Sequence, residues 1–277
     1  MTNAKITQSL NDAQGAYGLR LDGLSTSLLV CPVPASWARV TLTQDPDTSP
    51  AERSTYSDNA IDLSYESGWG VSLRRETGTM TFQVRRRVPD DELVHPLLAP
   101  AAMHFAAWLG HAAFHGGAFV RHGRAFGVLA ERNHGKSTTL ARLAASGIPV
   151  LVDDALVVDN GIAFAGPRCI DLRPEAVSDD SLESVRGDGR RRLRLPPIEP
   201  SYPLGGVFVL RWDDRLSLES LPPSERLIAL ARHCRPEVGR TPALLELSRL
   251  PVWRVQRPRD PACLDDVCDR LLEAALT

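Results

Sequence analysis

The sequence has almost no lysine. Only Lys5 and Lys136 are lysines, and the other residues in its Lys and Arg total of 32 are arginines. Arginine is a rigid planar fork, whereas lysine is a compact point charge on a thin stem, so lysine fits where a crowded backbone loop excludes arginine. Lys136 therefore marks a position where a single ammonium group is needed.

An excess of charge of either sign is also lacking. The 32 basic and 34 acidic residues give a formal net charge of -2, so no overall field favours a nucleic acid or an anionic membrane. The 277 residues are 43% hydrophobic and 24% charged, which is a globular composition that excludes collagen, coiled coil and wholesale disorder. We expect no nucleic-acid partner, and an anionic ligand must be held locally.

Long apolar runs and cysteine pairs are lacking as well. The one long uncharged stretch, 94–120, is rich in Ala and interrupted by His, Pro and Gly, so we expect no membrane span. The N-terminus has no apolar segment behind a basic start, which argues against a signal peptide. The five scattered cysteines have no CxxC spacing, which suggests neither a disulfide framework nor a zinc site. We expect a reducing, cytoplasmic setting.

The local sequence pattern changes near residue 95. Before this point, short segments rich in Thr, Val and Leu alternate with turn-forming residues, which is typical of a small β-rich unit. We expect a β-rich N-terminal region over 1–95 and a second region over 96–277 that begins with a helix over Leu97–His115. The predicted N-terminal strands are Tyr17–Leu21, Thr26–Cys31, Ala38–Thr43, Gly70–Arg74 and Met80–Val84.

The second region follows the order strand, glycine loop, helix, strand and acidic pair. Residues Asp153 and Asp154 end this series, and a hairpin around Asn160-Gly161 follows them. The order predicts an α/β fold. The predicted elements are strands over Gly117–Arg121, Ala125–Ala130 and Ile148–Val152, and a helix over Lys136–Ser146 that stops at Gly147.

Residues 130–137 partly match the phosphate-binding pattern G-x-x-x-x-G-K-[S/T]. In such loops backbone N–H groups and the helix N-terminus surround the phosphates, Lys reaches the terminal ones and the hydroxyl holds Mg²⁺. Ala130 replaces the first glycine, and Glu131 is unfavourable near phosphate unless it points outward. The alternative is a strand–helix turn with Ser137 as the cap. The expected nucleotide-binding residues of the loop are Asn133, His134, Gly135, Lys136, Ser137 and Thr138.

The acidic pair follows a buried strand. Adjacent side chains on an extended segment point to opposite sides, so Asp153 can contact Mg²⁺ together with Ser137 while Asp154 faces a hydroxyl acceptor as a base. The alternative is a turn at the strand end with two solvated carboxylates.

Residues 115–168 resemble the catalytic domain of bacterial HPr kinase/phosphorylase and its diverged relatives. In that family a His precedes a strand pair, a GKS-type loop follows, and an Asp-Asp pair ends the next strand. The resemblance implies a P-loop kinase core with a mixed sheet, like that of HPr kinases and phosphoenolpyruvate carboxykinases. It also implies an ATP- and Mg²⁺-dependent serine kinase, in which Asp153 places the metal, Asp154 is the base and His115 supports the pair.

The match to the family has limits that bear on the substrate. The glycine-containing signature that follows the acidic pair in the true HPr enzymes is missing, which argues against HPr as the substrate. Diverged relatives of this kind also act as tailoring kinases for ribosomal peptides. The segment Tyr202–Leu210 resembles the strand that comes next in these relatives.

Two arginines are further candidates for nucleotide binding. Arg168 resembles an arginine of the diverged relatives. Arg192 belongs to a basic segment, 190–194, that we expect to be a mobile loop able to clamp a phosphate or an acidic acceptor, with a solvated surface loop as the alternative. We expect Trp212, like Trp108 and Trp253, to lie in the core or an interface.

Three functional hypotheses remain. The first is a kinase that moves the γ-phosphoryl group of ATP to a hydroxyl, most simply a Ser of a peptide or protein. The second keeps this chemistry with a small-molecule acceptor, and the third is a nucleotide-binding module without catalysis, motivated by Ala130 and Glu131. The oligomeric state, including a homo-oligomer, and the replacement of ATP by pyrophosphate stay open.

Overall fold

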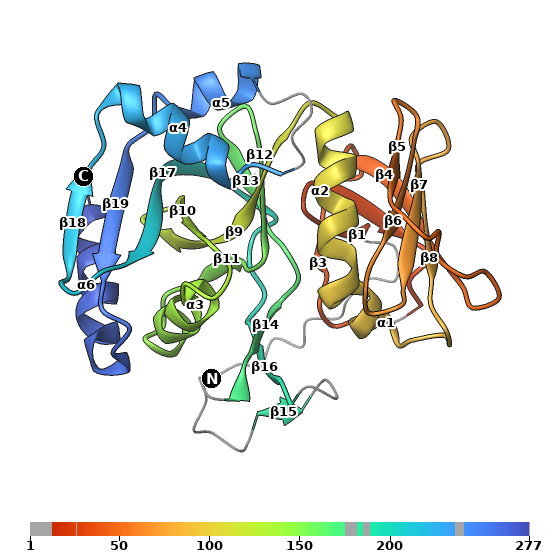
Figure 1. Ribbon diagram of the computed structural model, residues 1–277, viewed down its shortest axis with the longest axis horizontal. Coiled ribbons are helices and arrows are strands. Elements are labelled where there is room, and N and C mark those ends of the chain that lie inside the picture. The colour runs from red at the N-terminus through yellow and green to blue at the C-terminus, as the bar shows by residue number, and fades with distance from the viewer. Residues whose placement is uncertain (1–12, 26, 175–181, 185–188, 236–240, 277) are drawn as a thin grey trace, which may run out of the picture.

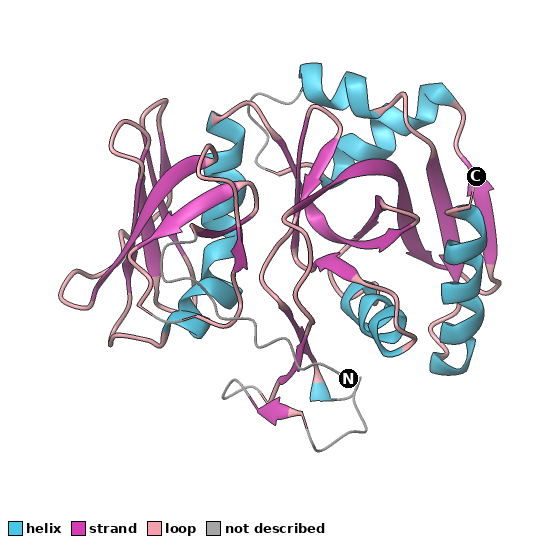
Figure 2. Ribbon diagram, turned by 180° about the vertical axis from the view of Figure 1, so that it is seen from behind, coloured by secondary structure: helices cyan, strands magenta, loops and turns pink. Residues whose placement is uncertain are grey.

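The structure is a computed structural model that describes residues 13–25, 27–174, 182–184, 189–235 and 241–276. Thr26 of the predicted strand 26–31 lies outside these ranges. The described chain is a mixed α/β fold with two eight-stranded mixed sheets and one three-stranded sheet. Figures 1 and 2 show the first large sheet at one end of the molecule, with helix α2 (Leu98–Trp108) between it and the rest.

The first sheet contains the N-terminal strands. Its strands β2–β4 and β4–β8 are parallel, and its other pairs are antiparallel. Residues alternate between the core and the surface, as in β6, where Ile61 and Leu63 are buried. The strands, in spatial order, are β3 (Cys31–Pro32), β1 (Gln14–Ala16), β2 (Leu19–Asp22), β4 (Ala38–Asp45), β8 (Thr79–Gln83), β7 (Gly70–Arg74), β6 (Ala60–Ser64) and β5 (Thr55–Tyr56).

The predicted strand Tyr17–Leu21 begins in the structure as a turn. Tyr17 and Gly18 have φ angles of 61° and 77°, and they form the two-residue connection of the β1–β2 hairpin. Positive φ at both central positions is the geometry of a type I′ turn, whose twist matches that of the flanking strands. The strand prediction was therefore wrong for these two residues.

The predicted helix Leu97–His115 is also shorter in the structure. After α1 (Asp90–Glu92) and η1 (Leu93–Leu97), α2 ends at Trp108, and Gly110 has a φ of 86°. Strand β9 (Ala112–Arg121) follows and includes His115. A buried strand rich in Ala and Phe has no polar face, so its sequence cannot be told from that of a buried helix.

The second large sheet closes on itself. Strand β10 (Arg124–Ala130) pairs with β9 on one side and β17 on the other, while β17 pairs with β13, β13 with β12, and β12 with β9. Beyond β17 lie β19 in parallel and β18 at the edge. The predicted strands of the second region are thus present. Their bounds are β11 (Val150–Val152), β12 (Ala155–Asp159), β13 (Ile162–Phe164), β17 (Ser201–Trp212), β18 (Ser217–Ser220) and β19 (Val252–Arg257).

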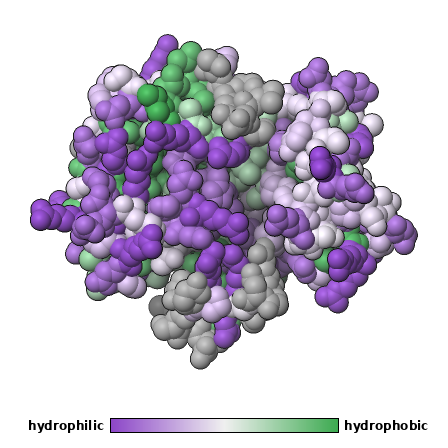
Figure 3. Space-filling model, in the orientation of Figure 1, coloured by the Kyte–Doolittle hydropathy of each residue, from purple (hydrophilic) through white to green (hydrophobic). Residues whose placement is uncertain are grey.

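Helices cover this sheet. The predicted helix over 136–146 is α3 (Lys136–Ala145), which buries Leu140 and Leu143 and contacts β9 and the C-terminal α6 (Leu264–Ala274). The remaining helices are α4 (Pro223–His233), α5 (Thr241–Leu247) and the short η3 (Pro261–Cys263). None of the described helices combines the length and the apolar character needed to cross a bilayer, and the face in Figure 3 is mostly hydrophilic.

The basic segment 190–194 is a strand in the structure, not a mobile loop. Strand β16 (Arg191–Arg194) pairs with β14 (Cys169–Leu172) and with β15 (Glu183–Ser184). Arg192 lies opposite Asp171 in this ladder and is 5% exposed. The sequence prediction of a mobile loop missed the burial of Arg192, because the carboxylate that balances its charge lies on another strand.

Candidate functional site

The candidate phosphate loop connects β10 to α3. Residues 131–135 form the turn, in which the N–H of His134 donates to the carbonyl oxygen of Glu131 (3.1 Å). Asn133 and Gly135 have φ angles of 69° and 75°, and Gly135 is the N-cap of α3 without a side-chain hydrogen bond. The alternative with Ser137 as the helix cap is therefore wrong. The first N–H groups of a helix have no partner within the helix, so this end of α3 offers donors to an anion.

Gly135 is required by its conformation and by its surroundings. A Cβ at this position would lie 1.9 Å from Nη2 of Arg257, and the same Nη2 donates to the carbonyl oxygen of His134 (3.0 Å). Because Arg257 is buried, its guanidinium has little room to move. The loop thus fits against β19 only with glycine at its end.

Substituting Gly135 with Ala should destabilise the protein and distort the loop. A left-handed conformation alone costs an L-residue about 1–2 kcal/mol, and the clash with Arg257 adds to this cost. The matched control is Gly123→Ala, since Gly123 has a φ of 71° with nothing within 4 Å of its added Cβ. Thermal unfolding should show a larger loss for Gly135→Ala. Equal losses in the two variants would contradict the role of the contact with Arg257.

The ammonium of Lys136 joins the loop to the acidic pair. Its Nζ is 2.7 Å from Oδ1 of Asp153 and 3.1 Å from Oδ1 of Asp154. The Lys136 and Asp153 side chains are 7% and 1% exposed, whereas the Asp154 side chain is 37% exposed. The sequence prediction that the loop and the acidic pair lie together is confirmed by these distances.

We expected the carboxylates of Asp153 and Asp154 to point to opposite sides, as on an extended segment. This prediction was wrong, since both contact Lys136. Asp154 has a φ of 72°, in the left-handed region, and the N–H of Ala155 donates to the carbonyl oxygen of Asp153 (3.0 Å). This break between β11 and β12 turns both carboxylates toward Lys136. Asp is one of the few residues enriched in this conformation, and such strained positions gather at functional sites.

The charges of the site favour the ionised forms of Asp154 and Lys136. Burial alone would raise the pKa of Asp154, but the Lys136 ammonium and then His95 outweigh it, so that the pKa lies well below its usual range. Burial alone would lower the pKa of Lys136, but Asp153 and then Asp154 hold it above its usual range. These directions favour a charged Lys136 ammonium and an ionised Asp154 carboxylate, which lie 3.1 Å apart.

His115 lies beside the acidic pair, as the resemblance implies. It faces Ala155 in the β9–β12 ladder, and the N–H of the next residue, Gly116, donates to the carbonyl oxygen of Asp154 (3.2 Å). Burial first, and then the charge of Lys136, lower the pKa of His115. His115 is thus a neutral imidazole at pH 7, and its supporting role stays a prediction.

Sequence reasoning missed His95 and Asp171. The Nε2 of His95 is 3.8 Å from Oδ2 of Asp154 and 3.5 Å from Oδ2 of Asp171. Asp171 accepts two hydrogen bonds from Arg192 (2.7 and 2.9 Å), which also donates to the carbonyl oxygen of His95 (2.9 Å). A polar network thus runs from Lys136 through Asp154 and His95 to Asp171 and Arg192, although neither ring nitrogen of His95 has a hydrogen-bond partner among the described residues.

Three buried groups of this network lie close enough to hold a metal ion. The donor atoms of His95, Cys169 and Asp171 lie within 4.8 Å of one another. However, the Arg192 guanidinium occupies both carboxylate oxygens of Asp171, and burial holds the pKa of the Cys169 thiol above its usual range. We therefore assign these residues to the polar network, in which Arg192 binds Asp171. The nucleotide contact of Arg192 stays a prediction.

Tyr17, in the β1–β2 turn of the first sheet, also interacts with the acidic pair. Tyr17 is fully buried, its N–H donates to the carbonyl oxygen of Ala165 (2.7 Å), and its hydroxyl has no hydrogen-bond partner among the described residues. Burial, followed by the charge of Asp154, holds the pKa of Tyr17 well above its usual range. No local sequence pattern indicated this contact between the first sheet and the rest of the chain.

The other predicted residues lie as follows. The Arg168 guanidinium is buried and donates to the carbonyl oxygens of Val150, Leu151 and Pro196 (2.8–3.0 Å). It therefore fastens β11 to the segment after β16, and its contact with a nucleotide stays a prediction. The partly exposed residues at the start of α3 are Ser137 and Thr138, while Glu131 and Asn133 are exposed and His134 is half-buried.

Comparison with known proteins gives a distant structural likeness. No family model and no curated protein matches the chain. A solved structure that it resembles is the Hpr(Ser) kinase/phosphatase from Coxiella burnetii, with 12% sequence identity and a TM-score of 0.33. The match covers 59% of this chain and 96% of that chain.

Proposed function

We propose that the protein is an ATP- and Mg²⁺-dependent kinase with a P-loop core that transfers the γ-phosphoryl group to a hydroxyl. The observation that carries this proposal is the position of Lys136. One of two lysines in the chain stands at the N-terminus of α3, with its ammonium between the two carboxylates of the acidic pair. Backbone donors, a lysine and carboxylates at one point are the parts that phosphoryl transfer requires.

The donor groups fit a magnesium ion. The Asp153 carboxylate and the Ser137 hydroxyl offer oxygen atoms, which Mg²⁺ prefers, and Mg²⁺ commonly takes only one or two protein carboxylates together with substrate phosphates. Asp153 and Ser137 would hold the ion. When bound, it would neutralise the negative charge that develops on the transferred phosphoryl group.

The chain's own residues position the reactants. Lys136 and the N–H groups of the loop would bind the β- and γ-phosphates. Asp154 would orient the acceptor hydroxyl. The hydroxyl oxygen would attack the γ-phosphorus, and the bond between this phosphorus and the leaving oxygen of ADP would break. The hydroxyl proton would pass to the Asp154 carboxylate. Such transition states are loose, so position and charge supply most of the rate. A carboxylate of low pKa therefore suffices as the acceptor of the proton.

The exposure of Asp154 bears on the acceptor. Its side chain is 37% exposed, in contrast to the 1% of Asp153, so a hydroxyl on a large molecule can reach it. We therefore favour a Ser of a peptide or protein over a small-molecule acceptor. The silent-binder alternative rested on Ala130 and Glu131. The side chain of Glu131 is exposed, so water weakens its repulsion of a bound phosphate.

Incubation with γ-labelled ATP and Mg²⁺ tests the proposal. Purified protein should hydrolyse ATP slowly, with water in place of the acceptor, and should label a peptide or protein in a cell extract from the source organism. The Asp154→Asn variant is the matched negative control. Binding of ATP without hydrolysis or labelled product would favour the nucleotide-binding module instead.

Magnesium should bind far more tightly in the presence of ATP than alone. Among the described residues the proposal assigns Asp153 and Ser137 as ligands, so most of the coordination must come from phosphates and water. Titration calorimetry with Mg²⁺, with and without ATP, measures the difference. Tight binding of Mg²⁺ to the nucleotide-free protein would contradict the assigned ligands.

A further inference from the structure

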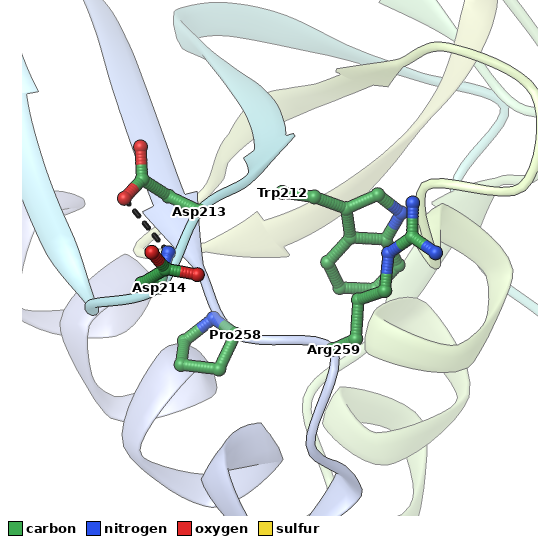
Figure 4. Close-up of a pocket in the computed structure, with 5 residues that line it drawn as sticks. All are labelled: Trp212, Asp213, Asp214, Pro258 and Arg259. Carbon is green, nitrogen blue, oxygen red and sulfur yellow. Dashed lines mark hydrogen bonds between the residues drawn. The ribbon is translucent and has the colours of Figure 1, made fainter.

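A cavity of about 410 Å³ opens beside the candidate phosphate loop (Figure 4). A second cavity, of about 330 Å³, adjoins the loop residues Glu131 and His134 and shares Trp212 with the first. The two cavities thus border the same indole ring. The first cavity is lined by Trp212, Asp213, Asp214, Pro258 and Arg259.

The topology places these residues on the same sheet edge as the loop. Strands β10, β17 and β19 are parallel neighbours, and Trp212 faces Arg257 at their carboxyl ends. In α/β sheets, ligands bind in the crevice outside the carboxyl ends of the strands. The acidic pair lies on the other side of β10, after β11, which pairs with β9. The loop thus has the acidic pair on one side and the cavity on the other.

Direct contacts join the cavity to the loop. The rings of Trp212 and His134 stack with their centroids 5.8 Å apart, and a Cβ on Gly135 would lie 3.2 Å from the Trp212 ring. The Arg257 guanidinium, 4.3 Å from the centre of that ring, donates to the carbonyl oxygen of His134. The indole is therefore within a few ångströms of the end of the loop.

The cavity offers the chemistry that recognises a base. Trp212 is partly exposed, and Arg259 lies over its ring with the guanidinium carbon 5.7 Å from the centroid (Figure 4). Because Arg259 is exposed, its guanidinium can move to the opposite face of a base that stacks on the indole. The Asp213 carboxylate is fixed by Gln256 and by the N–H of Asp214 (2.8 Å). These two acidic side chains can accept hydrogen bonds from an exocyclic amino group or from ribose hydroxyls.

We propose that Trp212 and Arg259 form the platform for the purine base of a nucleoside triphosphate whose phosphates bind the loop 131–137. This inference rests on the proposed function and adds to it where the phosphoryl donor lies. The nucleoside part of the donor lies on the β17 side of β10, and the acceptor enters on the β9 side. Stacking on Trp212, rather than hydrogen bonds alone, then distinguishes ATP from a bare polyphosphate.

Titration calorimetry with ATP, GTP and inorganic triphosphate, each with Mg²⁺, tests the platform. Wild-type protein should bind ATP or GTP more tightly than triphosphate. Stacking of one base contributes about 1–3 kcal/mol, so Trp212→Ala should weaken binding of the preferred nucleotide about 5- to 150-fold. Its affinity for triphosphate should change by less than about twofold. Trp212→Phe, which keeps an aromatic face, should retain most of the nucleotide affinity.

A second variant guards against loss of folding. Arg259 is exposed, so Arg259→Ala should fold normally and weaken nucleotide binding without affecting triphosphate. The matched control is Arg124→Ala, since Arg124 is also exposed and lies at the opposite end of β10 from the loop. Equal wild-type affinities for nucleotide and triphosphate, or equal losses for both ligands in the variants, would overturn the platform and leave the phosphate site intact. Absence of binding of all three ligands to wild type would overturn both.

Discussion

Replacing Asp154 with Asn should reduce phosphoryl transfer by about 10²- to 10⁴-fold, the usual contribution of general-base assistance. The amide is nearly isosteric with the carboxylate, and Lys136 keeps its closer contact with Asp153 (2.7 Å). ATP and Mg²⁺ should therefore bind almost as tightly as to wild type. Slow ATP hydrolysis, measured by release of labelled phosphate, is the first assay, and transfer to the acceptor is the second.

Two further substitutions sharpen this comparison. Asp153→Asn should weaken the Mg²⁺-dependent part of ATP binding, because Asp153 is the proposed metal ligand. Asp159→Asn is a control for the loss of one negative charge, since Asp159 lies at the far end of β12 from the acidic pair. Equal hydrolysis by wild type and Asp154→Asn, with no phosphorylated product, would remove the base from the mechanism and favour the silent binder.

Replacing Lys136 with Met should strongly weaken nucleotide binding and also destabilise the protein. A hydrogen bond to a charged group contributes about 1.5–3 kcal/mol, so ATP affinity should fall about 10- to 150-fold. In the structure Lys136 is buried against Asp153, and removal of one partner of a buried ion pair typically costs about 3–5 kcal/mol.

A double variant separates the two effects. Lys136→Met combined with Asp153→Asn removes both partners, so the buried charge is no longer unpaired and part of the stability should return. The ATP affinity should stay as low as that of the Lys136→Met variant, because the ammonium is still missing. Chemical denaturation and ATP titration of the two single variants and the double variant measure both properties. Normal ATP binding by the double variant would contradict the phosphate-loop assignment.

The parts of the fold that could be predicted are those with local signals. Strands β10 and β11 are apolar runs with clear ends, and α3 begins after Gly135 and ends before Gly147. The uncharged segment before His115 carried no such signal, because a buried helix and a buried strand are both apolar on all sides. The prediction therefore extended the helix across the start of β9. The division at residue 95 stays a prediction.

The candidate site shows the same limit. Lys136 and Asp153 are 17 positions apart, joined by one helix and one strand, so their meeting followed from the order of elements. His95 and Arg192 are 97 positions apart, and their contact depends on a strand register and a helix kink that no local pattern indicates. Trp212 looked like a core residue for a related reason: its ring is apolar, and only the parallel order of β10, β17 and β19 places it beside the loop.

The contacts between the first sheet and the rest of the chain have a consequence for how the protein unfolds. One hydrophobic cluster includes Val40 and Phe82 of the first sheet together with Phe114 and Leu156 of the second, and Tyr17 is bonded to Ala165. Neither sheet can lose its packing without exposing apolar surface of the other. Heating should therefore melt both in one cooperative transition. A nucleotide bound at the end of β10 should then also raise the temperature at which the first sheet melts, although this sheet lies on the other side of α2.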